Sequence, residues 1–126
     1  MIHYNTMGAG LLTGKYSPGQ RPDKGRLTDN KMYQARYDAD WMYAVAGRFT
    51  EFARQRGYEP AALAAAWVGS HPAVTAPIIG ARSLVQLEGS LKSVDIVMTP
   101  ELRAEISALS PEPPTATDRN DEVAQK

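Results

Sequence analysis

Two short stretches carry the residues best suited to binding an anion. In residues 4–16, glycines recur ahead of Lys15, and glycine lets backbone amides approach a ligand closely. In residues 76–90, an apolar run ends at a turn containing Arg82, and Ser83 opens a segment with helical leucine spacing. A helix N-terminus and an adjacent guanidinium attract phosphate by independent mechanisms. The two stretches therefore favour a phosphate-bearing ligand held between them.

A plainer interpretation stays open for the same residues. Arg82 can be a solvated turn residue, and the glycines can serve only to turn the chain. His3 falls in a predicted strand and His71 precedes a proline, so both are interpreted as structural or surface residues. The chain has no cysteine, which excludes disulfides, thiol nucleophiles and thiolate metal sites. No residue is predicted to be catalytic, and no metal site is predicted.

The elements that must position these residues alternate between strands and helices. Because ligands of parallel α/β folds bind where strands end, both stretches occupy the expected place for a site. Two strands cannot close a barrel or cover both faces of a parallel sheet. The predicted elements are a strand in 1–5, a glycine loop from residue 6, helices over 40–56 and 60–70, a strand in 73–80 with Pro77 near its start, a helix over 83–94 and a helix beginning at Pro100.

Short sequence patterns predict where two of the helices begin. Ser83 and Gln86 have the spacing of a capping box, and Thr99 precedes a proline at a helix start. The first long helix is expected to bury one apolar face, made of Trp41, Val45, Phe49 and Phe52.

Two polar segments are interpreted as irregular. Residues 17–38 predict a long surface loop, in which Tyr33 and Tyr37 either pack locally or, with Met32, line a substrate entrance. Residues 111–126 are rich in proline and polar side chains and predict a disordered tail after a single domain over 1–110.

The overall composition excludes several partners. Lys plus Arg and Asp plus Glu each number 14, so the net charge is zero. This argues against nucleic-acid binding and provides no polybasic patch for a membrane surface. The N-terminus lacks the features of a secretory signal, and no apolar run reaches the roughly 20 residues of a membrane helix. The sequence predicts a soluble, cytoplasmic chain.

Two segments resemble the aldo-keto reductases. "YNTMGAGLLTGKY" (4–16) is similar to the family's Y-S-P-L-x-x-G-x-L-T-G-K-Y segment. "LAAAWVGSHPAVTAPIIGARSLVQLEGSL" (63–91) is similar to its A-W-V-x-x-x-P-x-V-x-x-P-I-x-G-A-R-x-x-x-Q-L segment. Their order and spacing agree, and the resemblance extends over about residues 1–109.

The resemblance implies a fold and an activity. The family folds as a (β/α)8 TIM barrel and transfers hydride between NADPH and an aldehyde or ketone. This α/β chain would supply the last two β/α units, incomplete as a standalone barrel. The family's catalytic Asp, Tyr, Lys and His precede the matched segments. The chain would therefore be a cofactor-binding portion that is inactive alone.

The resemblance also implies a role for individual residues toward NADP. Tyr4 would stack on the nicotinamide. The pyrophosphate would be followed by Asn5, Thr6, Met7, Gly8, Gly10, Leu11 and Lys15, and the 2′-phosphate, ribose and adenine would be faced by Gly80, Ala81, Arg82 and Gln86. At Gly89 and Ser90 the sequence departs from the acid or amide and the Asn that the family tends to place on adenine. Glycine offers no side chain there, so the adenine contact is expected to be lost.

Two other interpretations remain. The chain could be a non-catalytic module that self-associates through an exposed sheet edge and apolar helix faces. It could also be a truncated remnant without function. A small carbonyl substrate is expected only if the full barrel exists, and neither nucleic acid nor membrane is expected as a partner.

Overall fold

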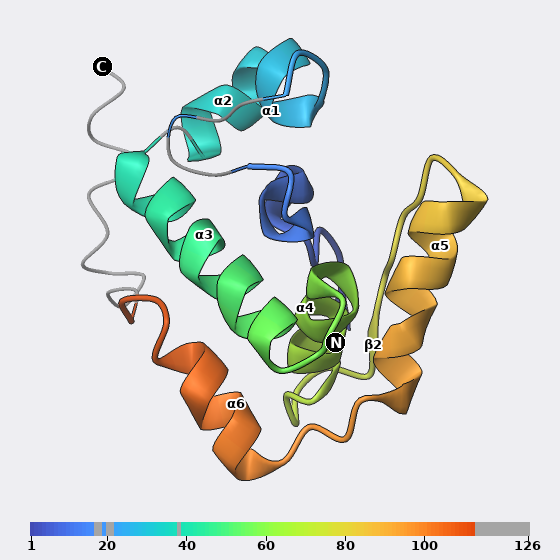
Figure 1. Ribbon diagram of the computed structural model, residues 1–126. Coiled ribbons are helices and arrows are strands. Elements are labelled where there is room, and N and C mark those ends of the chain that lie inside the picture. Colours follow the sequence, from blue (N-terminus) through green and yellow to red (C-terminus); the bar gives the residue numbers. More distant parts are fainter. Residues whose placement is uncertain (17–18, 20–21, 38, 113–126) are drawn as a thin grey trace.

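The computed structural model describes residues 1–16, 19, 22–37 and 39–112. The chain is an α/β structure, mostly helical, with two parallel strands. In chain order (Figure 1) its elements are β1 (Ile2–His3), the 3-10 helix η1 (Gly8–Thr13), α1 (Arg26–Asp29), α2 (Lys31–Tyr37), α3 (Asp40–Gln55), α4 (Pro60–Gly69), β2 (Ala76–Pro77), α5 (Leu84–Leu91), the 3-10 helix η2 (Lys92–Asp95) and α6 (Pro100–Ser107).

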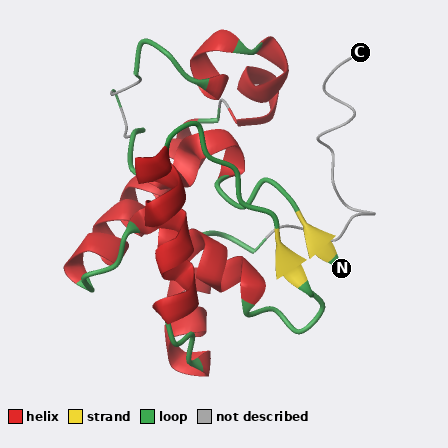
Figure 2. Ribbon diagram, turned by 90° about the vertical axis from the view of Figure 1, so that its right-hand side faces the viewer, coloured by secondary structure: helices red, strands yellow, loops and turns green. Residues whose placement is uncertain are grey.

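The strands β1 and β2 pair in parallel, with Ile2 opposite Ala76 (Figure 2). The Thr75 amide donates to the Met1 carbonyl at 2.7 Å, and the Ile78 amide donates to the His3 carbonyl at 2.6 Å. Both strands lie within their predicted segments but are only two residues long. Pro77 is the second and last residue of β2, and because proline has no backbone N–H it cannot donate to the ladder. The paired strands bring the two predicted loops to one end of the sheet.

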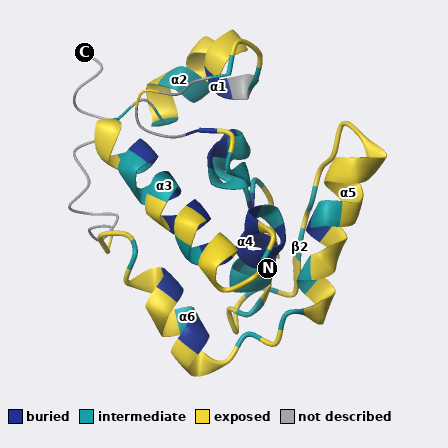
Figure 3. Ribbon diagram, in the orientation of Figure 1, coloured by how far each residue is buried: buried dark blue, intermediate teal, exposed yellow. Residues whose placement is uncertain are grey.

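The main core forms where side chains of α3, α4 and α6 meet (Figures 1 and 3). Leu63 of α4 is fully buried, with 0% exposure. Buried alanines on α4 let the neighbouring backbones approach closely because they carry only a methyl group. This cluster comprises Phe49, Ala53, Leu63, Ala64, Leu102 and Ile106.

The buried face of α3 differs from the predicted one. Trp41 is 52% exposed, so its assignment to the apolar face is wrong. Tyr43 and Ala46 are buried instead, packed in a cluster with Leu11 of η1 and Leu27 of α1. Those partners come from segments predicted as loops, and this is why periodicity alone misplaced the start of the face.

The predicted helix caps are present. The Ser83 hydroxyl accepts from the Gln86 amide at 3.2 Å, and the Gln86 side chain accepts from the Arg82 amide at 2.8 Å. The reciprocal bond therefore reaches one residue beyond the usual capping box. The α-helical part of this segment ends at Leu91, and η2 continues it.

Removing the cap of α6 is expected to destabilise the chain. The Thr99 hydroxyl accepts from the Leu102 amide at 3.1 Å. Thr99→Ala should lower the free energy of unfolding by about 1 kcal/mol, because an orphan amide loses its acceptor. Urea denaturation measures the change. Thr99→Ser keeps the acceptor and should stay close to wild type, and an equal loss in both variants would contradict the capping role.

The predicted loop over residues 17–38 contains the short helices α1 and α2. Side-chain bonds stabilise the turn before α1, since the Gly25 amide donates to the Asp29 carboxylate at 3.0 Å. Leu27 is 4% exposed and ties α1 to the core. Residues 17, 18, 20, 21 and 38 of this segment, and residues 113–126 of the predicted tail, lie outside the described residues. No helix in the described part of the chain is long and apolar enough to cross a membrane.

Candidate functional site

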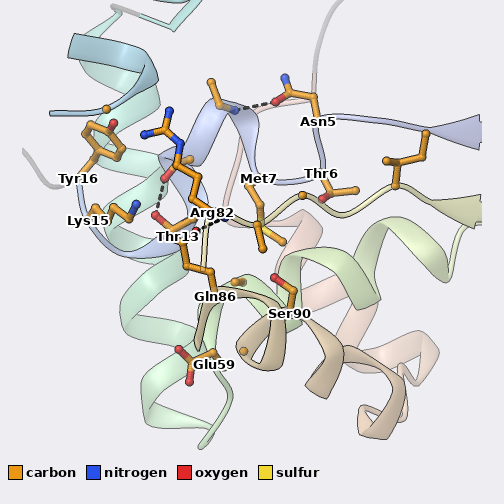
Figure 4. A pocket seen from close by; sticks show the side chains of 18 of the residues that line it. Asn5, Thr6, Met7, Thr13, Lys15, Tyr16, Glu59, Arg82, Gln86 and Ser90 are labelled. Carbon is orange, nitrogen blue, oxygen red and sulfur yellow. Dashed lines mark hydrogen bonds between the residues drawn. The ribbon is translucent and has the colours of Figure 1, made fainter. Parts of the chain in front are cut away.

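A cavity of about 600 Å³ opens at the carboxyl ends of β1 and β2 (Figure 4). It lies there because parallel strands send their following loops to the same end of a sheet. Ten of the twelve residues assigned to the cofactor line it: Tyr4, Asn5, Thr6, Met7, Gly10, Lys15, Gly80, Ala81, Arg82 and Gln86. The structure therefore brings together residues that are separated by more than sixty positions.

Two of the assigned residues do not line the cavity. Leu11 is only 6% exposed and packs in the cluster shared with Tyr43 and Ala46. A Cβ added at Gly8 would meet Leu11 and Tyr37, at 3.7 and 3.9 Å, rather than the cavity. Leu11 and Gly8 therefore contribute to the packing of the loop after β1 and not to the cavity surface.

The loop after β1 is held in an uncommon backbone conformation. Asn5 and Ala9 have φ angles of 61° and 57°, in the left-handed region, which costs non-glycine residues energy. The Asn5 side chain accepts from the Ala9 amide and donates to the Tyr37 hydroxyl, both at 2.8 Å. Asn5 thus fixes this loop to α2, a structural function beside its place in the cavity wall.

Gly14 turns the chain from η1 toward Lys15. Its φ is 84°, a left-handed value that glycine adopts without cost. A Cβ there would lie 3.3 Å from both the Arg54 guanidinium and the Thr50 methyl. The backbone angle favours glycine at this position, and a side chain would also crowd Arg54 and Thr50. The turn brings Lys15 to the cavity.

Most of the charged side chains that line the cavity are cationic. Its lining includes Lys15, Lys24 and Arg82 as cations and Glu59 as a carboxylate. Lys24 and Glu59 were not anticipated as site residues, because Lys24 lies in the predicted loop and Glu59 just before the start of α4. Cations surrounding a concave surface focus a positive potential that attracts anionic groups. The exposed Arg82 side chain supplies a planar fork suited to phosphate.

Tyr16 connects the cavity to the segment that precedes α1. It is 3% exposed and meets the Tyr43 ring edge-on at 6.3 Å. A Cβ at Gly25 would come within 2.6 Å of the Tyr16 hydroxyl, so only glycine allows this approach. Burial raises the pKa of the Tyr16 phenol above its ordinary value, while a hydrogen bond with the Leu27 backbone and the charge of Arg82 oppose that rise.

The raised pKa predicts a loss of stability at alkaline pH. A phenol that holds its proton more tightly when folded contributes stability that is fully present below the ordinary pKa of about 10. That contribution is lost as the pH rises from there through the raised value. Urea unfolding at pH 9 and pH 11 should show a smaller alkaline loss in Tyr16→Phe than in wild type. Tyr4→Phe, at an exposed tyrosine, is the matched control, and an equal effect of both variants would contradict the assignment.

The remaining candidates have structural contacts only. The His71 ring accepts from the Ala73 amide at 3.1 Å, and His3 lies in β1. Within the described ranges, no group of three or more His, Cys, Asp or Glu side chains could hold a metal ion.

Comparison with known proteins places the chain in a family. The model of the aldo/keto reductase family matches residues 1–111. Protein tas of Escherichia coli (strain K12) is 30% identical over 109 residues, which is 86% of this chain and 31% of that protein. A probable voltage-gated potassium channel subunit beta of Oryza sativa subsp. japonica is 30% identical over 119 residues, 91% of this chain and 36% of that protein. The uncharacterized oxidoreductase YrpG of Bacillus subtilis (strain 168) is 35% identical over 66 residues, 52% of this chain and 20% of that protein.

The chain spans about a third of the length of the first two of these relatives. The family match nevertheless covers most of the chain, including the loops after both strands and helices α3 to α6. The chain belongs to the aldo/keto reductase family.

Proposed function

We propose that this chain is the C-terminal, cofactor-binding portion of an NADP-dependent aldo-keto reductase, contributing the last two β/α units of its barrel. The observation that carries the proposal is the position of Arg82, on the wall of a cavity of about 600 Å³ that Lys15 also lines. This volume falls within the usual range for small-molecule and cofactor sites. NADPH, when bound, would supply the hydride for reduction of an aldehyde or ketone.

The donor set suits a dinucleotide phosphate. Arg82 would bind the 2′-phosphate in a bidentate manner, and Lys15 would neutralise the pyrophosphate as a point charge. The left-handed turn at Gly10, which lines the cavity, would let backbone amides lie near the pyrophosphate. Gln86 is held by its bond to the Arg82 amide and would orient the turn that carries the guanidinium.

Tyr4 would bind the nicotinamide end. It is 71% exposed and lines the cavity, so its ring is accessible to a flat partner. Stacking on Tyr4 would hold one face of the nicotinamide and keep water from it. We assign no proton-transfer step to this chain, because general acid catalysis needs a donor within hydrogen-bond reach of the carbonyl oxygen. The chain alone is expected to show no carbonyl reductase activity.

A comparison of NADPH with NADH tests the proposal directly. The 126-residue chain is titrated with each dinucleotide, and binding is followed by isothermal calorimetry. NADPH should bind more tightly, since only it carries the 2′-phosphate that Arg82 would receive. Equal affinity for NADPH and NADH, or no saturable binding of NADPH, would contradict the proposed cofactor site.

A second candidate function is self-association of the chain. The observation that favours it is a set of exposed apolar side chains on and after α5, where Figure 3 shows mostly exposed residues. Burying these side chains against a second copy would remove apolar surface from water. The set comprises Leu84, Leu91, Val94 and Val97, exposed by 75%, 48%, 82% and 79%.

Self-association predicts a size that depends on concentration. Size-exclusion chromatography with light scattering should give a dimer mass that falls toward 13.8 kDa on dilution. Leu84→Glu should shift the equilibrium to the monomer, because it would bury a charge in the contact. Ala104→Glu introduces the same charge at an exposed position of α6, outside this set, as a control. A monomer mass at every concentration would rule this function out.

A further inference from the structure

Glu59 is the one carboxylate among the described residues that line the cavity. Figure 4 shows it on the far side of Gln86 from the Arg82 guanidinium. The two ends of the cavity therefore differ in charge. A phosphate is attracted toward Arg82 and Lys15 and repelled by Glu59, so a group that binds beside Glu59 is expected to be a hydrogen-bond donor.

The Glu59 side chain fills space that Gly89 leaves open. A Cβ added at Gly89 would lie 3.8 Å from Glu59 Cγ and 3.9 Å from Glu59 Oε1. These are ordinary contact distances, so the carboxylate stands where a side chain at position 89 would extend. Ser90, the next residue, is 4% exposed and also lines the cavity. The sequence predicted that this end lacks a recognising side chain, and the structure places Glu59 there from another helix.

The Glu59 carboxylate has no strong structural contact among the described residues. Glu59 is the N-cap residue of α4, but its side chain makes no capping hydrogen bond. Its Oε2 lies 3.9 Å from Lys92 Nζ, in a pair whose side chains are about half exposed, and such pairs contribute little. The other oxygen, Oε1, is the one beside Gly89, so a strong acceptor faces the cavity.

We propose that Glu59 accepts a hydrogen bond from the 6-amino group of the adenine of NADPH and makes the site selective for an aminopurine. This inference rests on the proposed cofactor function and adds a specificity residue to it. A carboxylate accepts hydrogen bonds but cannot donate them when ionised. It therefore favours the 6-amino group of adenine and disfavours the 6-oxo group of hypoxanthine, which is itself an acceptor.

The test compares NADPH with its 6-oxo analogue, in which hypoxanthine replaces adenine. Wild-type chain should bind NADPH about tenfold more tightly than the analogue, the effect of one hydrogen bond to a charged acceptor. Glu59→Gln should bring this ratio close to one, because an amide can either accept from an amino group or donate to a carbonyl. Glu88→Gln makes the same chemical change on α5, outside the cavity lining, and should keep the wild-type ratio.

Glu59→Asp provides a second variant, since it keeps the charge but withdraws the carboxylate oxygen by one methylene. The ratio of its affinities for NADPH and the 6-oxo analogue should fall between the ratios of wild type and Glu59→Gln. The inference is overturned if Glu59→Gln keeps the wild-type ratio, or if it weakens both dinucleotides equally, while Arg82→Ala still weakens NADPH. In those cases the proposed function survives. If wild-type chain binds NADPH no better than NADH, the proposed function fails and this inference falls with it.

Discussion

Replacing Arg82 with alanine is expected to weaken NADPH binding by about 10- to 30-fold and to leave NADH binding nearly unchanged. The guanidinium stands at the cavity wall beside the N-terminus of α5, where the 2′-phosphate would be received. Charge-assisted hydrogen bonds contribute about 1.5–3 kcal/mol, and each 1.4 kcal/mol is a factor of ten. Because the Arg82 side chain is exposed to solvent, the lower part of that range applies. Calorimetric titration of both dinucleotides measures the change.

Two further variants separate charge from geometry. Arg82→Lys keeps the positive charge but loses the planar fork, so its NADPH affinity should fall between those of wild type and Arg82→Ala. Arg36→Ala removes an exposed arginine of α2 that does not line the cavity, and it should bind NADPH as wild type does. An NADPH-to-NADH ratio that is the same in wild type and Arg82→Ala would refute phosphate recognition by this residue.

Replacing Leu63 with alanine is expected to lower the free energy of unfolding by about 2–5 kcal/mol. Leu63 is 0% exposed and belongs to the cluster joining α3, α4 and α6. The substitution removes buried methyl groups and leaves a cavity that helices cannot close without moving. Since small domains have total stabilities of about 5–15 kcal/mol, this is a large share. Urea denaturation followed by circular dichroism gives the change in midpoint.

An exposed position provides the control for this substitution. Met32 on α2 is 53% exposed, so Met32→Ala should change the unfolding free energy by less than about 0.5 kcal/mol. If Leu63→Ala unfolds at the same urea concentration as wild type, the packing of α4 at the centre of the fold is wrong. If Leu63→Ala is already unfolded without urea, its loss of stability reaches the upper end of the expected range.

The helices were predictable because their signals are local. Thr99 with Pro100, and Ser83 with Gln86, mark helix starts within a few residues of sequence, and the structure has both caps. The identity of the buried face of α3 was not predictable in the same way. It depends on Leu11 and Leu27, which reach α3 only through tertiary packing, so Trp41 was misassigned. The helices α1 and α2 are short, and they lie in a polar segment with glycines and prolines that is typical of a loop. For this reason the sequence did not predict them.

The site residues in the loops after the strands were predictable from the sequence. Those brought together by packing between helices were not. Arg82 and Lys15 lie in βα loops, and a parallel pair of strands brings such loops together. Glu59 and Gly89 are thirty positions apart in sequence and meet only because α4 and α5 pack against each other. The left-handed angles of Asn5 and Ala9 have no clear signal in the sequence, because asparagine adopts this region only occasionally and alanine rarely.

The pairing of β1 with β2 also has a consequence for how the chain folds. It joins Met1 to Thr75, which are 74 positions apart, whereas most helix contacts form locally. Contacts between distant residues slow folding, because the chain must close a long loop before they form. The two loops that carry Lys15 and Arg82 become one site only after that closure. A dinucleotide bridging them would act as a non-covalent crosslink, raising the apparent stability of the closed chain in proportion to the logarithm of its concentration above saturation.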